Sequence, residues 1–220
     1  DGLELTGADV KTAYLYGFIE PEIKLYMRQP RGYEKTGPDG KPMVCRLIRS
    51  IYGLRQSGAR RETRLVEQLT KMGFERSVQD PCLYKIRRDG HILLLGVYVD
   101  DLCFASSNKN LRSAIFGELR SVFEIKDTGP LNWMLNTGIC QDLRAGTVTI
   151  SQKLYIDDAV STFFPDGLPD KVGRVMPCTE ELQGLEPLAD GESIDPRYRM
   201  GVGKLVWLVS ISRPDVAFTH

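Results

Sequence analysis

The chain has 220 residues, of which 42% are hydrophobic, and its 29 basic and 29 acidic residues give a formal net charge of zero. This composition is that of a folded globular chain and excludes an intrinsically disordered or uniformly basic protein. The longest apolar run, Ile92 to Val99, is too short to cross a bilayer, so we expect no membrane partner.

Histidine and cysteine chemistry has little support in the sequence. The two histidines, His91 and His220, are far apart, and the five cysteines are scattered singly without a CxxC pair. This pattern indicates free thiols in a reducing compartment and argues against a zinc site, a disulfide framework or a Ser-His-Asp triad. Carboxylates are the metal ligands in good supply, and they suit Mg²⁺ or Mn²⁺.

The first third of the chain predicts short strands followed by a helix. Segment 8–17 favours a strand and then a turn or short helix, and the alternation in 22–30 favours a second strand. A helix is expected after them and before Gly73, because three apolar residues recur with helical spacing: Leu65, Leu69 and Met72.

The centre of the chain predicts a β-hairpin and a return strand. Asp89-Gly90 between two apolar runs is a strong turn signal, and the strand after it runs from Ile92 to Val99. A return strand at 102–106 follows, and then an amphipathic helix that Asn108 or Ser107 would cap. The apolar face of this helix is expected to contain Ile115, Leu119, Val122 and Phe123.

Toward the C-terminus, segment 146–152 alternates as a strand, and segments 152–164 and 198–212 favour helices. The acidic segment 178–196 contains several glycines and prolines, and we expect it to be a linker. Strands with helices between them indicate an α+β fold, an antiparallel sheet with helices packed on one face.

Two adjacent aspartates, Asp100 and Asp101, separate two apolar strands. Aspartates are common in turns because their side chains bond the nearby backbone and tolerate the left-handed conformation. Another adjacent pair, Asp157-Asp158, falls in a predicted amphipathic helix, where a solvent-exposed face explains it. The pair between the strands differs, because rigid strands support it and its mutual repulsion needs a cation to offset it. With Asp9 on another strand, three carboxylates could hold two divalent cations for in-line displacement at phosphorus.

An ordered set of segments carries a family resemblance. "YVDD" (98–101) and "DVKTAYLYG" (9–17) resemble the reverse transcriptase palm of copia-type LTR retrotransposons. Further matching segments follow in the family's order: "LYMRQPRGYE" (25–34), "VCRLIRSIYGLRQS" (44–57), "GFERSVQDPCLY" (73–84), "FEIKDTG" (123–129), "SQKLYI" (151–156) and "YRMGVGKLVWLVSISRPDVAF" (198–218). The resemblance covers nearly the whole chain and identifies it as a fragment of a Pol polyprotein.

The resemblance implies that Asp9, Asp100 and Asp101 are the catalytic residues. Together with the backbone carbonyl of Val10, they would hold two Mg²⁺ ions, or Mn²⁺ in their place.

It also implies three nucleotide-binding residues. Tyr14 would lie under the incoming sugar and exclude a ribose 2′-hydroxyl, Gln56 would lie beside the nucleotide and template, and Tyr98 would line the site near the primer terminus. Without the motif, either tyrosine could be a packing residue.

A basic segment surrounds the second motif. From residue 41 to 64 there are seven basic residues and one acidic residue, Glu62. The resemblance implies that the template strand passes here, so we expect sequence-independent, salt-sensitive phosphate contacts. The residues concerned are Arg46, Arg49, Arg55, Arg60, Arg61 and Arg64, although a solvated helix face explains any single arginine equally well.

Two motifs depart from the family pattern. After "LRQS" the family has a proline and then an arginine and a tryptophan, whereas this chain has Gly58, Ala59, Arg60 and Arg61. The region that resembles the primer grip reads "WMLNTGICQD" where a "FLGxEI" pattern is typical.

The resemblance implies a polymerase palm in 1–130, a primer-grip-like hairpin and thumb-like helix in 131–175, and an acidic linker with the start of a connection region in 176–220. The fingers, ribonuclease H and integrase segments of a full Pol polyprotein are expected elsewhere, as further partners. No signal peptide is visible, so we expect an intracellular, cytoplasmic protein, or one inside a virus-like particle.

The function implied is RNA-directed DNA polymerisation, with dNTPs and a primed RNA or DNA template as partners. The alternative is a degenerate or domesticated relic that binds nucleic acid without polymerising. A third hypothesis, a nucleotide cyclase built on a similar two-metal palm, does not explain "SIYGLRQS" (50–57).

Overall fold

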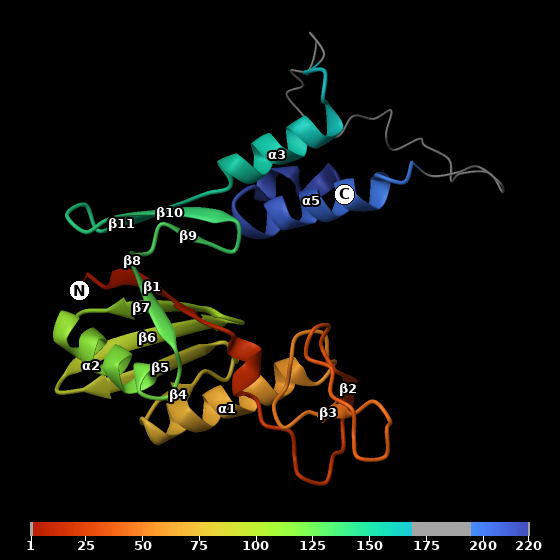
Figure 1. Cartoon of the computed structure of the whole chain (residues 1–220). Helices are drawn as coiled ribbons and strands as arrows, with labels where there is room; N and C mark the ends of the chain where they lie inside the picture. The colour runs from red at the N-terminus through yellow and green to blue at the C-terminus, as the bar shows by residue number, and fades with distance from the viewer. Residues whose placement is uncertain (1, 169–194, 220) are drawn as a thin grey trace. The chain divides into compact units, whose positions relative to one another are not determined.

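The computed structural model describes residues 2–168 and 195–219, and the chain divides into two compact units after Leu131 (Figure 1). Most of the predicted acidic linker, together with Cys178, lies outside the described residues. The four cysteines that are described, Cys45, Cys82, Cys103 and Cys140, are free thiols, as the sequence predicts.

The first unit is built on a six-stranded antiparallel sheet. Its strands, in spatial order, are β4 (Glu75–Arg76), β5 (Leu83–Arg88), β6 (His91–Tyr98), β7 (Asp101–Ser106), β1 (Glu4–Val10) and β8 (Ile125–Pro130). The red strand β1 therefore lies between β7 and the green strand β8, although at least ninety residues separate it from each of them in sequence (Figure 1). The α+β class with an antiparallel sheet is confirmed.

The predicted hairpin between β5 and β6 is confirmed. Asp89 and Gly90 both have positive φ, 50° and 76°, which is the backbone that a two-residue type I′ turn requires. Glycine adopts this conformation without strain, and aspartate tolerates it.

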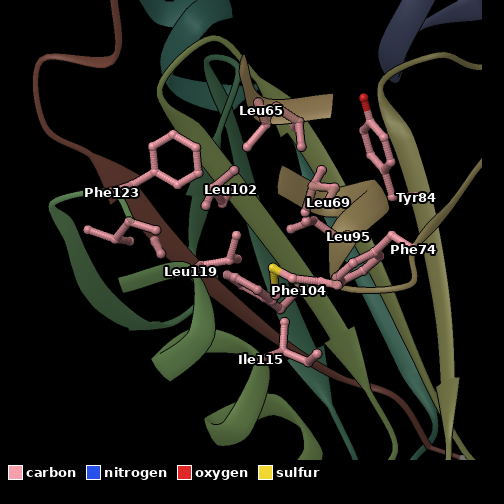
Figure 2. Close-up of a cluster of buried hydrophobic side chains, with 14 of the residues drawn as sticks. Leu65, Leu69, Phe74, Tyr84, Leu95, Leu102, Phe104, Ile115, Leu119 and Phe123 are labelled. Carbon is pink, nitrogen blue, oxygen red and sulfur yellow. The ribbon is translucent and has the colours of Figure 1, made fainter. Parts of the chain in front are cut away.

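Two helices cover one face of the sheet, α1 (Ser57–Lys71) and α2 (Lys109–Arg120). Leu69 of α1 and Ile115 of α2 are fully buried, and so are Leu95 and Phe104 on the facing strands; Figure 2 shows this core. Alternate strand residues point to one face of a sheet, so the sequence pattern selects which face the helices bury.

The helix ends follow local chemistry. The side chain of Asn108 caps α2 by accepting from the backbone N–H groups of Asn110 and Leu111, as predicted. Gly73 follows α1 with φ of 89°, the left-handed position typical of a helix end. Helix α2 ends at Arg120, so the prediction that it includes Val122 and Phe123 is wrong.

Strand β8 was not predicted. Its sequence, IKDTGP, is mostly polar, and it pairs only with β1 at the edge of the sheet, with a register shift opposite Gly7 and Ala8. An edge strand tolerates charged residues and proline, so it lacks the apolar alternation that reveals an inner strand.

Segment 11–56 connects β1 to α1. It contains the 3₁₀-helix η1 (Ala13–Tyr16) and a small antiparallel pair, β2 (Tyr26–Arg28) and β3 (Val44–Arg46). The predicted strand in 22–30 is thus shorter than expected.

The described part of the second unit combines a small sheet with helices. The sheet contains β9 (Trp133–Met134), β10 (Thr137–Asp142) and β11 (Thr147–Ser151), and the helices are α3 (Lys153–Phe163), α5 (Tyr198–Ile211) and the 3₁₀-helix η2 (Pro214–Thr219). The buried Gln152 accepts a 2.7 Å hydrogen bond from the hydroxyl of Ser212, which ties the start of α3 to the end of α5. No helix in the described ranges is long and apolar enough to cross a membrane.

Candidate active site

A row of four side chains crosses four neighbouring strands at one end of the sheet in the first unit. Tyr98 pairs with Asp101, Asp101 with Asp9, and Asp9 with Lys126, so the row runs over β6, β7, β1 and β8. Directly opposed residues in antiparallel strands project from the same face. Because the chain neighbours of Asp9 are buried in the core, this row lies on the face opposite the helices.

Asp100 lies beside this row, in the two-residue turn between β6 and β7. Its backbone carbonyl accepts a 2.7 Å hydrogen bond from the N–H of Val10, at the end of β1. The turn residue before it, Val99, has φ of 51°, an unfavourable conformation for a β-branched side chain. Such strain persists only where surrounding contacts fix the backbone, and the bond to Val10 is one of them.

The three aspartates influence one another electrostatically. The pKa of Asp101 is raised above its ordinary value, first by the protein atoms packed around the carboxylate, although the residue keeps access to solvent, and then by the charges of Asp100 and Asp9. This repulsion would be relieved by a bound cation.

The donor set matches Mg²⁺ or Mn²⁺ in chemistry, because these hard cations prefer carboxylate oxygens. The strand register fixes Asp9 and Asp101 as a pair, and Asp100 is close enough to act on the pKa of Asp101. Within the part of the chain that the structure describes, no three or more His, Cys, Asp or Glu side chains are already gathered as a metal site.

A cavity of about 340 Å³ opens beside the aspartate turn. Its lining includes Tyr14, Arg61, Tyr98 and Val99. The ring of Tyr14 packs edge-on against Tyr52 with a centroid separation of 4.8 Å, so it is a braced wall of the cavity. The structure therefore brings together two of the three residues that the resemblance places at the nucleotide.

The third residue, Gln56, does not line this cavity. It is the residue before α1, and its side chain makes no capping hydrogen bond to the helix. Its amide is thus not committed to the helix end.

The six predicted arginines differ in their surroundings. Arg60 forms an ion pair with Glu20, and Arg46 donates a 3.0 Å hydrogen bond to the carbonyl of Pro21. The guanidinium groups of Arg49 and Arg64 both lie over the exposed ring of Phe18, 5.2 and 5.9 Å from its centroid.

Arg55 and Arg61 have no hydrogen bond or ion pair to another described residue. Arg55 is exposed, whereas Arg61 is half-buried in the cavity wall. Neither guanidinium is therefore held by a hydrogen bond or ion pair to another described residue, and of these two arginines Arg55 is the one that is accessible to a phosphate in solution.

Sequence reasoning missed Lys126. It lies in the matched segment "FEIKDTG", but only the register of β8 against β1 reveals that it stands directly opposite Asp9. The alternative aspartate pair, Asp157-Asp158, is explained by surface ion pairs: Asp157 with Lys153 at 2.7 Å and Asp158 with Lys204 at 2.6 Å.

Residues 2–179 match the family described as reverse transcriptase (RNA-dependent DNA polymerase). The chain belongs to the reverse transcriptase family. It is 30% identical, over 98% of its length, to a retrovirus-related Pol polyprotein from transposon TNT 1-94 of Nicotiana tabacum. Over 96% of its length it is 29% identical both to the corresponding polyprotein from transposon RE1 of Arabidopsis thaliana and to a putative transposon Ty5-1 protein of Saccharomyces cerevisiae.

The chain spans 16%, 14% and 66% of these three relatives. The resemblance to a reverse transcriptase segment of a retrotransposon Pol protein is thus confirmed.

Proposed function

We propose that residues 1–130 form a polymerase palm that adds deoxynucleotides to a primer 3′-hydroxyl on an RNA or DNA template. The observation that carries this proposal is the strand register that sets Asp9 opposite Asp101, with Asp100 in the adjoining turn. Membership of the reverse transcriptase family supports the same reaction.

Asp9, Asp100 and Asp101 would hold two Mg²⁺ or Mn²⁺ ions, with the carbonyl oxygen of Val10 as a further ligand. Such ions, when bound, activate the attacking hydroxyl and stabilise charge on the leaving pyrophosphate. The chain contributes a rigid mounting: β1 and β7 hold two carboxylates in register, and the hydrogen bond from Val10 fixes the turn that bears the third. A preorganised site of this kind needs little rearrangement during the reaction.

The nucleotide would bind in the cavity beside the turn. Tyr14 is braced by Tyr52, and its carbonyl accepts a 2.6 Å hydrogen bond from Ser50, so its ring cannot move aside easily. A fixed ring under the sugar would clash with a ribose 2′-hydroxyl and favour deoxynucleotides. Tyr98 would lie near the primer terminus, next in register to Asp101, and Gln56 would contact the nucleotide or the template.

The second unit would handle the primer. The hairpin of β9 and β10 would act as a primer grip and α3 as the start of a thumb. Fingers, ribonuclease H and integrase segments of a Pol polyprotein would be its partners.

Primer extension tests the proposal. The chain is incubated with a DNA primer on an RNA template, dNTPs and Mg²⁺ or Mn²⁺, beside Asp100→Asn, Asp101→Asn and the control Asp157→Asn. We expect extension to fall by on the order of 10²-fold or more in the first two variants and to be unchanged in the third. Undiminished extension in both Asp100→Asn and Asp101→Asn would refute the site.

A second function, nucleic-acid binding without polymerisation, is favoured by one observation. Arg61 brings a positive charge close to Asp100, in the segment after Ser57 where this chain departs from the family pattern. This function predicts that the chain binds a primer–template duplex yet extends no primer under any metal condition.

A further inference from the structure

Arg61 is an unusual residue for the wall of the cavity. It projects from α1, is half-buried, and lines the cavity together with Tyr14, Tyr98 and Val99. Within the described residues, no hydrogen bond or ion pair holds its guanidinium. A charged group withdrawn from water without a direct partner is unfavourable unless another charge offsets it.

The carboxylates around Arg61 show which charge does so. The adjacent Glu62 is engaged by Arg76 in a hydrogen-bonded ion pair. Burial lowers the pKa of Arg61, and the largest influence that opposes this is the negative charge of Asp100. Asp100 directly follows Val99, which lines the same cavity as Arg61, so it is the carboxylate that we pair with Arg61.

The backbone keeps Asp100 within range of that guanidinium. Its carbonyl is bonded to the N–H of Val10, and the residue before it, Val99, forms part of the same cavity wall as Arg61. Helix α1 is anchored to the core by the buried Leu65 and Leu69. The backbones that carry the two side chains are thus both held in place by the strand turn and the core.

We propose that Arg61 is a built-in counter-cation of Asp100 that weakens divalent-cation binding at the three aspartates. This rests on the proposed function, because it takes Asp9, Asp100 and Asp101 as the metal site. The guanidinium neutralises part of the negative charge of Asp100, which would otherwise attract the cation. Arg61 thus acts through Asp100 as a positioning and electrostatic residue, not as a catalytic one.

The affinity for Mn²⁺ tests this proposal. It is measured from the electron paramagnetic resonance signal of unbound Mn²⁺, and the measurement requires no nucleotide, no nucleic acid and no polymerase activity. Arg61→Met and Arg61→Gln remove the charge, and Arg61→Lys keeps it. Arg87→Met, an exposed arginine on β5 of the same sheet, controls for a general loss of positive charge. We expect about tenfold tighter Mn²⁺ binding in the two neutral variants, and unchanged binding in Arg61→Lys and Arg87→Met.

Mn²⁺ affinity that is unchanged or weaker in the neutral variants overturns the proposal. Circular dichroism spectra and melting curves identify any variant that does not fold. If Arg61→Met or Arg61→Gln fails to fold, the Mn²⁺ affinity of the other one tests the proposal. The effect must also depend on Asp100, so Arg61→Met should give no tightening in the Asp100→Asn background; tightening there equally overturns it.

Failure of the proposed function gives a different result. If Asp9→Asn and Asp101→Asn leave Mn²⁺ binding unchanged, the metal-site assignment itself is wrong. If those variants lose Mn²⁺ while the neutral Arg61 variants bind it as the unsubstituted chain does, only the role of Arg61 is overturned. Weaker binding of dATP in Arg61→Met, with Mn²⁺ affinity unchanged, would instead assign Arg61 to the phosphates of the nucleotide.

Discussion

Asp9 and Asp101 face each other across the β1–β7 strand pair, as directly opposed residues. Like charges in this relationship destabilise a sheet, so the arrangement works against the stability of the chain when no cation is bound. The pKa of Asp101 is raised, first by burial and then by the charges of Asp100 and Asp9, so the repulsion adds to a cost that burial already imposes.

Asp101→Asn should therefore stabilise the metal-free chain. A raised carboxyl pKa means that the folded state holds the proton more tightly than the unfolded state, whose ordinary pKa is 3.8. The penalty is fully present above the folded pKa and disappears as the pH falls below 3.8. Because the carboxylate is largely exposed and water screens its charge, we expect Asp101→Asn to raise the unfolding free energy at pH 7 by well under about 1 kcal/mol, with the gain shrinking toward pH 3. Urea unfolding with a chelator present, at several pH values, measures it; a loss of stability at pH 7 would contradict the argument.

Substitution of Asp127 should have the opposite effect on the free energy of unfolding. Arg112 donates to its carboxylate, including a 2.8 Å bond, and this lowers the pKa of Asp127 below 3.8. The resulting stability is present above pH 3.8 and is lost as the pH falls through the folded pKa. Asp127→Asn should cost about 1 kcal/mol or less at pH 7, because the carboxylate is partly exposed and water screens the pair. The same urea series compares the two variants, and a gain in stability for Asp127→Asn would count against it.

Val99→Gly tests the strain in the aspartate turn. Glycine adopts φ of 51° without the steric conflict of a β-branched side chain, but it adds freedom to the unfolded chain. We expect a net change between zero and about 1 kcal/mol in favour of the variant. Val97→Gly, at a buried position of β6, is the contrast and should lose about 2 kcal/mol or more. Thermal melts measure both, and a Val99→Gly loss as large as that of Val97→Gly would show that the turn is not strained.

The sequence was sufficient where local chemistry decides the structure. Asp89-Gly90 specifies its turn, and Asn108 specifies the start of α2, because each effect acts within a few residues. Motif resemblance suggested the three aspartates, but the pairing of Asp9 with Asp101 is a property of the strand register. Nothing local could show that Lys126 stands opposite Asp9, since β8 is a polar edge strand without alternation.

Long-range packing also determines which partners the six arginines of the basic segment contact. Six similar residues in one basic segment gave a single expectation, phosphate binding. The structure separates them: an ion pair takes up Arg60, the ring of Phe18 engages Arg49 and Arg64, and Arg61 turns into the cavity. These differences depend on which face of α1 meets the sheet, and net charge carries no such information.

Arg55 and Arg60 should consequently differ in nucleic-acid binding. Arg55 is exposed and uncommitted, so its removal should weaken binding of a primer–template duplex and reduce the slope of log affinity against log salt by about 1. The side chain of Arg60 is only 11% exposed and is paired with Glu20. Arg60→Ala should leave the salt slope unchanged and lower the melting temperature instead, because it leaves Glu20 without its partner. Fluorescence anisotropy between about 50 and 200 mM salt, with melting curves of both variants, separates the two roles. Equal slopes for Arg55→Ala and the unsubstituted chain would remove Arg55 from the interface, and a reduced slope for Arg60→Ala would mean that its ion pair opens to bind phosphate.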